Sequence, residues 1–175
     1  MQKVKYFFGC LLALTLLMAM TNKPTEKVNW ISFEQLQQMY DSAPKPIIVD
    51  LYTDWCGWCK VMDKNTYGNS KVAKFINEHY YAVKYNAESK ENVVFNGKTY
   101  SYNPEYKTND VAIYLSSGQL EYPNTIFLSG LNATPAPLAG YMKPKEFEAP
   151  VKYFSKAANQ NMTFVAFNQQ LKKEW

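Results

Sequence analysis

Trp55-Cys56-Gly57-Trp58-Cys59-Lys60 follows the apolar run Ile47–Tyr52 and opens residues 61–65, which can be helical. A strand that turns at once into a helix, with Cys-x-x-Cys at the joint, is typical of a thiol–disulfide redox site. The first turn of a helix has unpaired backbone N–H groups and the positive end of the helix dipole, so a cysteine there ionises more easily. The thiolate is the form that attacks disulfides. We therefore expect Cys56 to be the attacking thiol and Cys59 the buried resolving thiol.

The first 21 residues have the pattern of a secretory signal peptide. Lys3 and Lys5 form a positive start, and residues 6–20 form an apolar run that is short for a membrane span. We expect residues 1–21 to be a signal peptide and residues 22–175 to be a single exported domain, periplasmic or secreted. Retention by an uncleaved N-terminal segment is the alternative.

Removal of this leader would leave two cysteines, Cys56 and Cys59. A zinc site needs four ligands, and the rest of the chain offers no third cysteine and one histidine. Covalent haem attachment needs a histidine directly after the second cysteine, where this chain has Lys60. A purely structural disulfide that closes so small a loop would add little stability. The pair therefore favours redox chemistry, with no metal and no organic cofactor implied.

Composition bounds the class of protein. A chain of 175 residues is long enough to bury about two thirds of its unfolded surface, and 47% of its residues are apolar. All 19 basic residues are lysine. Without arginine, the chain has no guanidinium group to form paired hydrogen bonds with phosphates or base edges. The formal net charge of +4 is also too small to indicate a polyanionic partner. Nucleic acid is therefore not an expected partner.

A family resemblance accompanies the cysteine motif. Val49-Asp50-Leu51-Tyr52 followed by Asp54-Trp55-Cys56-Gly57-Trp58-Cys59-Lys60 resembles the thioredoxin superfamily. With the following residues 61–67 and Val72, the chain looks most like secreted thioredoxin-like proteins and the periplasmic thioredoxin domain of DsbD-type disulfide reductases. The likeness runs from about residue 30 to about residue 154. It implies an α/β, thioredoxin-like fold, with a mixed central sheet and helices on both faces.

The resemblance also implies roles for two charged residues. Asp50 matches an aspartate that lies beneath the second cysteine in thioredoxins, so it would exchange a proton with Cys59, directly or through water. Burial should raise its pKa, which suits that task near neutral pH. Lys84 matches the lysine that partners this aspartate. The alternative is that Asp50 caps a backbone amide and Lys84 is a solvated strand residue.

Substrate-binding residues follow from the same resemblance. Tyr122-Pro123 matches the cis-proline loop that packs against the cysteine pair, and the residue before the proline has backbone groups free to pair with an extended substrate. A trans proline at the start of a strand is the alternative. Trp55 and Trp58 flank the thiols, with Gly57 between them, and are expected to form an apolar platform for substrate. Gly57-Trp58 stands where thioredoxin has Gly-Pro, which leaves the redox potential open.

Residues 89–109 look inserted relative to a minimal thioredoxin. Within them, residues 93–95, Asn96-Gly97 and residues 98–102 predict a β-hairpin, because Asn-Gly suits a two-residue primed turn. The insertion is rich in tyrosine, which suits either recognition or a small satellite core.

Local patterns predict the remaining elements. Ser32 and Gln35 form a capping box at the start of a helix. Strands are expected at residues 81–85, 125–128 and 137–141. Ser70, Asp110 and Thr163 are expected to cap further helices, and Pro144 is expected at the first helical position of another.

The expected function is thiol–disulfide exchange in an exported compartment, most readily as a reductase. Cys56 would attack a target disulfide and Cys59 would resolve the mixed disulfide. The expected partners are protein or peptide disulfides, with a membrane reductase of the DsbD type as electron donor. Two alternatives stay open: a disulfide oxidase or isomerase, and a non-enzymatic binding module.

Overall fold

A mixed sheet of five strands forms the centre of the protein. The computed structural model describes residues 26–156 and 162–175, and the expected signal peptide lies outside them. The strand order is β1-β3-β2-β8-β9. In that order the strands are β1 (Trp30–Ile31), β3 (Tyr81–Asn86), β2 (Ile47–Tyr52), β8 (Asn124–Leu128) and β9 (Ala136–Ala139).

β2 is the middle strand of this sheet and runs toward the cysteine motif. It is parallel to β3, with Ile47 opposite Tyr81, and antiparallel to β8, with Ile47 opposite Leu128. Its residues are buried from Ile47 through Leu51. A strand covered on both faces requires such a nearly continuous apolar run. The mixed central sheet predicted from the sequence is confirmed.

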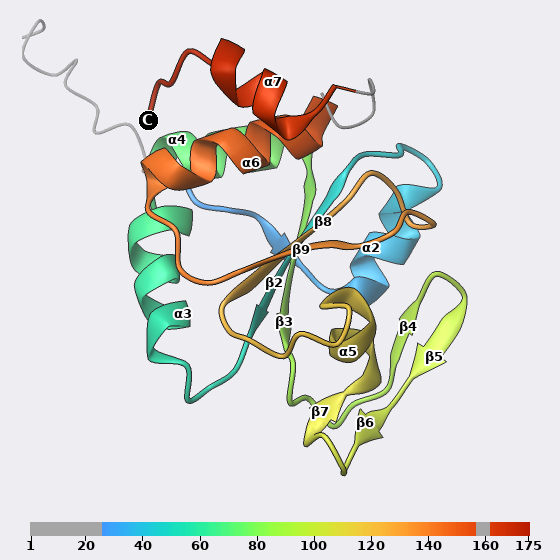
Figure 1. The fold of residues 1–175 in the computed structure, drawn as a ribbon. Coiled ribbons are helices and arrows are strands. Elements are labelled where there is room, and N and C mark those ends of the chain that lie inside the picture. The colour runs from blue at the N-terminus through green and yellow to red at the C-terminus, as the bar shows by residue number, and fades with distance from the viewer. Residues whose placement is uncertain (1–25, 157–161) are drawn as a thin grey trace, which may run out of the picture.

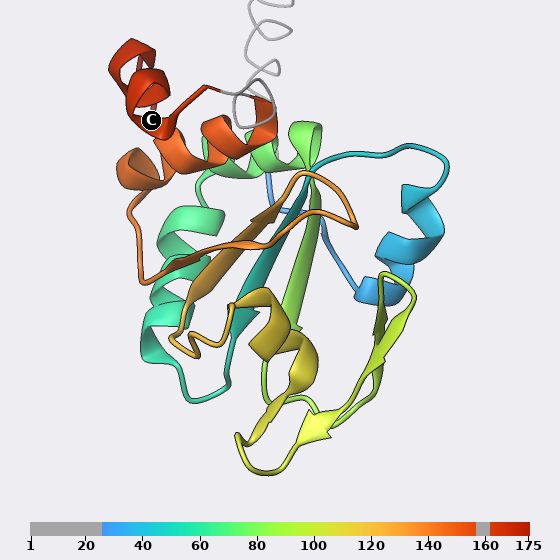
Figure 2. The same ribbon diagram turned by 45° about the vertical axis from the view of Figure 1, so that its right-hand side comes forward.

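Helices cover both faces of the sheet, as predicted (Figure 1 and Figure 2). On one face lie α2 (Phe33–Tyr40) and α5 (Asp110–Leu115). The other face is covered by α3 (Gly57–Met62), the π-helical turn η1 (Asp63–Tyr67), α4 (Ser70–His79) and α6 (Pro144–Lys156), and α7 (Phe164–Gln170) packs on α6.

Successive side chains of β2 point alternately to the two layers of helices that cover the sheet. Ile47 and Val49 pack in the core formed with α2 and α5, whereas Ile48 packs with Met62 of α3. Successive side chains of a strand point to opposite faces. Asp50 therefore points toward the same layer as Ile48, the layer that carries the cysteine motif.

The predicted hairpin forms within the insertion. β4 (Val93–Phe95) pairs with β5 (Lys98–Tyr100), and the turn residues Asn96 and Gly97 have φ of 50° and 71°, as a primed turn requires. The second strand was predicted to reach residue 102, but it ends at Tyr100. The chain then begins a second ladder, in which β6 (Tyr102–Asn103) pairs with β7 (Thr108–Asn109).

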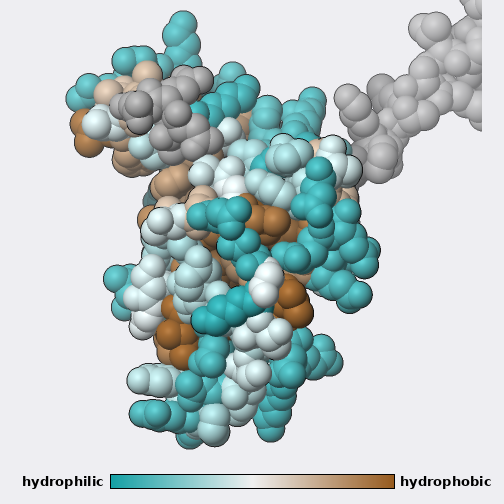
Figure 3. Space-filling model, turned by 90° about the vertical axis from the view of Figure 1, so that its right-hand side faces the viewer, coloured by the Kyte–Doolittle hydropathy of each residue, from teal (hydrophilic) through white to brown (hydrophobic). Residues whose placement is uncertain are grey.

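The hairpin buries one side against α2 and leaves the other in solvent. Phe95 and Tyr100 are buried in the same core cluster as Phe33 of α2, while Val94, which points the other way, is half exposed. On the face that carries α2 and the hairpin, hydrophobic surface is divided into small areas by hydrophilic side chains (Figure 3). The aromatic residues of the insertion therefore extend the main core on this face of the sheet, and the separate satellite core that was one expectation for them does not form.

Two helix caps differ from the prediction by one residue. Ser32 and Gln35 form the predicted capping box of α2. The caps of α4 and α5, however, are Asn69 and Asn109, whose side chains accept from backbone N–H groups of the first turn. The residues predicted as caps, Ser70 and Asp110, are instead the first helical residues. Asparagine is as good a cap as serine or aspartate, so the pattern alone allowed both registers.

Within residues 26–156 and 162–175, no helix is both long enough and apolar enough to cross a bilayer. The division into a signal peptide and a single exported domain stays a prediction.

Candidate redox site

Cys56 and Cys59 form a disulfide at the N-terminus of α3. Cys56 is the N-cap residue, and its Sγ accepts a hydrogen bond from the backbone N–H of Cys59 at 3.0 Å. Upstream, the N–H of Cys56 donates to the carbonyl of Thr53 at 3.2 Å, which fixes the turn between β2 and α3. The sulfur of Cys56 thus faces the unpaired amides of a helix start, where a thiolate would be stabilised.

Burial does not distinguish the two cysteines. We expected Cys59 to be the buried member of the pair, but Cys56 and Cys59 are each 4% exposed. In this oxidised form the two sulfurs are bonded to each other, so each covers its partner. The asymmetry lies in the helix instead: Cys56 caps it and accepts a hydrogen bond, whereas Cys59 is inside its first turn and donates one.

Asp50, Lys84 and Asp63 form a chain of charges that runs from β2 through β3 to the end of α3. Asp50 and Lys84 face each other across β2 and β3, and Lys84 Nζ donates to Asp50 Oδ2 at 2.9 Å. Lys84 also donates to Oδ1 of Asp63, the C-cap residue of α3. The Asp50 side chain is 2% exposed, and that of Asp63 is 40% exposed. The lysine therefore links a buried carboxylate to one at the surface.

The geometry overturns both alternative interpretations of this pair. Lys84 is not a solvated strand residue, because its side chain is 23% exposed and bonds two carboxylates. Asp50 caps no backbone amide: Oδ2 accepts from Lys84, and Oδ1 has no hydrogen-bond partner among the described residues. That free, buried oxygen is available to a proton donor in the α3 layer.

The electrostatics of the pair favour a proton exchange near neutral pH. Burial raises the pKa of Asp50 from 3.8 to about 6, although the charge of Lys84 opposes the increase. Burial lowers the pKa of Lys84, but the Asp50 and Asp63 carboxylates outweigh it and the net pKa is raised. Lys84 thus stays charged while Asp50 changes between its two forms.

Two aromatic pairs border the disulfide. Trp55 meets Tyr122 edge to face, with ring centroids 6.1 Å apart, and Trp58 stacks on Tyr141 at 5.4 Å. Trp55 is 68% exposed and Trp58 is 62% exposed, although both are large and apolar. Exposed aromatic surface beside a reactive group indicates a contact surface for another molecule. Gly57 lies between the tryptophans as the first residue of α3, with open space around it.

The loop before β8 is the third part of the site. The Tyr122–Pro123 peptide bond is cis, the isomer that the resemblance implied, and not the trans alternative. The carbonyl of Pro123 accepts from the N–H of Gly140 at 2.8 Å, which joins this loop to the segment that carries Tyr141.

Three residues of the site were not predicted. Asp63 lies four positions after Cys59, the spacing that places two residues on one helix face, and this signal was present in the sequence. Tyr141 and Glu88, which bonds the indole of Trp55, reach the site through long-range contacts. No local pattern marks either of them.

The family model of Thioredox_DsbH, described as "Protein of unknown function, DUF255", matches residues 15–175. The chain belongs to this family. A thiol:disulfide interchange protein DsbD from Colwellia psychrerythraea is 36% identical over 77 residues, which are 39% of this chain and 13% of that protein. The chain spans 13% of the length of the curated relatives that it matches.

Solved structures show the same fold. A DsbH oxidoreductase is 18% identical with a TM-score of 0.54, covering 79% of this chain and 92% of that one. A thioredoxin from Thermus thermophilus is 12% identical with a TM-score of 0.56, covering 76% of this chain and 93% of that one. The protein is thus a thioredoxin-fold member of the Thioredox_DsbH family, similar to disulfide oxidoreductases, with a Cys-Gly-Trp-Cys pair.

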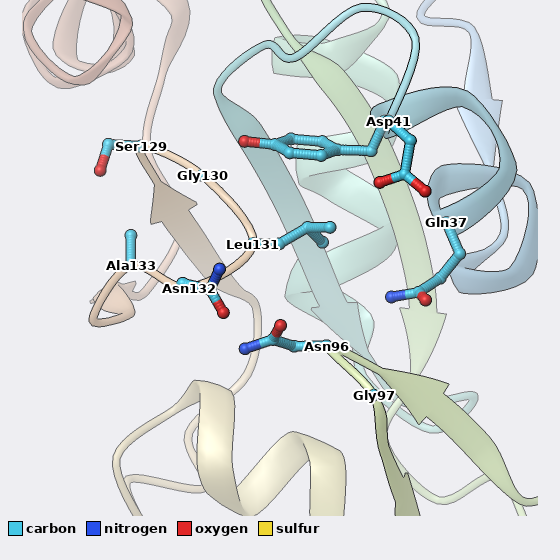
Figure 4. A pocket seen from close by; sticks show the side chains of 10 residues that line it. Gln37, Asp41, Asn96, Gly97, Ser129, Gly130, Leu131, Asn132 and Ala133 are labelled. Atoms are coloured by element: carbon cyan, nitrogen blue, oxygen red, sulfur yellow. The ribbon is translucent and has the colours of Figure 1, made fainter.

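A separate pocket of about 590 Å³ lies away from the disulfide, between α2, the hairpin turn and the loop after β8 (Figure 4). Its lining includes Gln37, Asn96 and residues 129–133. Leu128, the last residue of β8, pairs with Ile47 at the start of β2. The pocket is therefore at the opposite end of β2 from the cysteines and takes no part in the redox site.

Proposed function

We propose that this protein reduces disulfide bonds of exported proteins by thiol–disulfide exchange through Cys56 and Cys59. The observation that carries the proposal is the position of Cys56 as the N-cap of α3, bonded to Cys59 and accepting its backbone N–H at 3.0 Å. A sulfur in this position has a stabilised thiolate, and a partner sulfur three residues on can release whatever it captures.

The exchange proceeds in two balanced steps from the reduced protein. The Cys56 thiolate attacks one sulfur of the target disulfide, forms a mixed disulfide and expels the other target sulfur as a thiolate. The Cys59 thiol then loses its proton, attacks Sγ of Cys56 and releases the second target thiolate. Two electrons pass to the target, and the protein is left with the Cys56–Cys59 disulfide.

Asp50 is the proposed acceptor of the Cys59 proton. It faces the layer of α3, has an unpartnered buried oxygen, and has a pKa raised by burial to about 6. At neutral pH its carboxylate is therefore available as a base. Lys84 is the proposed positioning residue that keeps this carboxylate ionisable inside the protein.

Trp55, Gly57, Trp58, Tyr122 and Pro123 are the proposed substrate surface. The two exposed tryptophans offer apolar contact on either side of the disulfide, and the loop before β8 offers backbone groups for an extended segment. A dithiol donor must then restore the reduced form. We assign this step to a membrane reductase of the DsbD type in an exported, periplasmic or secreted, location.

Partner trapping tests the chemistry. In Cys59→Ala the first step proceeds and the second cannot, so target proteins should remain linked to Cys56 and be released by dithiothreitol. Cys56→Ala is the matched control and should trap none. A binding module without exchange chemistry would retain the same partners in both variants and release none with dithiothreitol.

The equilibrium potential against glutathione tests the direction. A value near about −270 mV supports reduction of targets, whereas a value near about −120 mV supports a disulfide oxidase. Acceleration of insulin reduction by the wild type, absent in both cysteine variants, would accompany the first outcome.

A further inference from the structure

Trp55 is mostly in solvent, yet its indole is held at two points. Its Nε1 donates to Oε1 of Glu88 at 2.8 Å, and its ring meets the edge of Tyr122. An exposed side chain that is already fixed loses little further freedom when a ligand binds against it. Trp55 and Tyr122 therefore form a preorganised aromatic surface beside Cys56, called here the Trp55–Tyr122 wall.

Hydrogen bonds hold the backbone at Glu88 and at the residue before it. The N–H of Glu88 donates to Oδ1 of Asn86 at 3.0 Å, and the preceding residue, Ala87, is bonded on both sides. The N–H of Ala87 donates to the carbonyl of Tyr52 at 2.8 Å, and its carbonyl accepts from the N–H of Asn109 at 2.7 Å. The two ends of the insertion are thus joined at Ala87, next to the last residue of β2. This arrangement fixes the carboxylate relative to the cysteine turn.

The wall is acidic although the chain is basic. The formal net charge is +4, but Asp54 and Glu121, the chain neighbours of Trp55 and Tyr122, are exposed carboxylates. Glu88 is a third carboxylate and is partly buried. The pKa of Tyr122 is raised chiefly by burial, and the charge of Glu88 adds to the increase. Complementary charge at a contact surface selects partners and orients them.

A cation fits an aromatic face that has a carboxylate at its edge. The protein already contains this combination in its interior, where Lys84 Nζ lies 5.0 Å from the ring centre of Tyr52 and 2.9 Å from Asp50. Cation–π attraction and ion pairing then act on the same ammonium group. Trp55 with Glu88 offers an exposed version of this arrangement.

We propose that Glu88 is a positioning and specificity residue of the exchange site, and that the Trp55–Tyr122 wall takes substrate segments with a lysine or arginine beside their cysteine. This inference rests on the proposed function. The insertion at residues 89–109 then serves to fix Glu88 for this purpose.

Two synthetic peptides test the specificity. They contain the same internal disulfide and differ only in having lysine or glutamate on both sides of the first cysteine. We expect the reduced protein to reduce the lysine peptide about tenfold more efficiently, as kcat/KM, at low salt, with a smaller ratio at about 0.5 M salt. Glu88→Gln keeps an acceptor for the indole and should bring the ratio close to one. Glu78→Gln, on the exposed surface of α4, is the matched control and should leave the ratio unchanged.

Two further variants separate position from charge. Glu88→Ala removes the acceptor as well as the charge and should raise KM for both peptides, with kcat little changed. Trp55→Phe removes the indole N–H but keeps Glu88, so it should raise KM for both peptides while the preference for lysine persists. Circular dichroism and thermal unfolding establish that each variant is folded.

The outcomes distinguish the two proposals. Equal reduction of both peptides by the wild type, or a ratio unchanged in Glu88→Gln, overturns the role of Glu88 and leaves the exchange function standing. Reduction of neither peptide nor of insulin overturns the exchange function, and the role of Glu88 falls with it.

Discussion

Asp50 and Lys84 lie directly opposite each other on β2 and β3, with Lys84 Nζ 2.9 Å from Asp50 Oδ2. The pair puts a charge inside a strand that is otherwise apolar, in the layer that carries the cysteine motif. A buried carboxylate alone would stay protonated well above neutral pH, and a lysine alongside brings its titration back toward neutral. The pair therefore accounts both for a cost in stability and for a group suited to proton transfer.

Asp50→Asn should make stability less dependent on pH. Because the pKa of Asp50 is raised by burial from 3.8 to about 6 in the folded protein, the proton is held more tightly in the folded than in the unfolded chain. The resulting stabilisation is complete below a pH of about 4 and is lost as the pH rises through about 6, a change of about 3 kcal/mol. Urea unfolding should show that the wild type loses about 3 kcal/mol between the low-pH and the high-pH end of this range and that the Asn variant does not. A difference in unfolding free energy between the two proteins that is the same at both pH values would contradict the assignment.

Asp50→Asn should also slow the resolving step. If the carboxylate takes the Cys59 proton, its loss lowers the rate of that step by about 10²-fold, as expected for general base catalysis. Single-turnover release of a substrate thiol from the mixed disulfide measures the rate. The wild-type rate should rise as the pH passes through about 6, where Asp50 loses its proton, and the variant should lack this rise. A variant with the wild-type profile would assign the proton to another acceptor.

Lys84→Met should raise the pKa of Asp50 above its value of about 6, because the lysine charge is what opposes the effect of burial. Removal of an adjacent positive charge raises the pKa of a carboxyl group by about 1 or more. Carbon-13 NMR titration of labelled aspartate carboxyls reports this shift directly. Lys74→Met, at an exposed lysine that pairs with Glu78 on α4, provides the control and should leave the titration of Asp50 unchanged.

The sequence predicted those features that depend on neighbouring residues. The continuous apolar run of β2, the Ser32 capping box and the Asn96-Gly97 turn each follow from local sterics or hydrogen bonding, and each is present in the structure. The cysteine turn belongs to this group, because strand, motif and helix are contiguous.

The charges and rings that surround the site depend on contacts that no local pattern encodes. Glu88 reaches Trp55 across 33 positions, and Tyr141 reaches Trp58 from the segment after β9. The link from Lys84 to Asp63 needs the register of β3 against β2 and the end of α3 at the same point. Such contacts depend on how the strands and helices pack in three dimensions. A family resemblance predicts only the contacts that the members of the family have in common.

Gly97→Ala should destabilise the protein by about 1–2 kcal/mol through backbone strain alone. Gly97 has φ of 71°, a left-handed conformation that costs a residue with a Cβ about that much. The added Cβ would meet no atom within 4 Å, so no steric clash contributes. Gly57→Ala is the matched control for stability: its Cβ is equally free, and its backbone does not have a positive φ. Urea unfolding should show a loss for the first variant and none for the second.

Glu148→Ala should destabilise the protein by releasing the C-terminal segment from α6. The Glu148 side chain is fully buried and accepts from Lys152 Nζ at 2.8 Å and from the backbone N–H groups of Glu174 and Trp175 at 2.7 and 3.2 Å. Removal of one partner from such a buried charged network costs about 3 kcal/mol, because the remaining groups are left without it.

The exposed pair of Glu78 with Lys74 on α4 is the matched comparison for Glu148. Its atoms are 3.8 Å apart and both side chains are more than half exposed, so Glu78→Ala should change the free energy of unfolding by less than about 1 kcal/mol. Equal losses in the two variants would show that the buried carboxylate does not hold the C-terminal segment. A large loss for Glu148→Ala with wild-type kcat/KM toward the lysine peptide would show that this segment stabilises the fold without shaping the redox site.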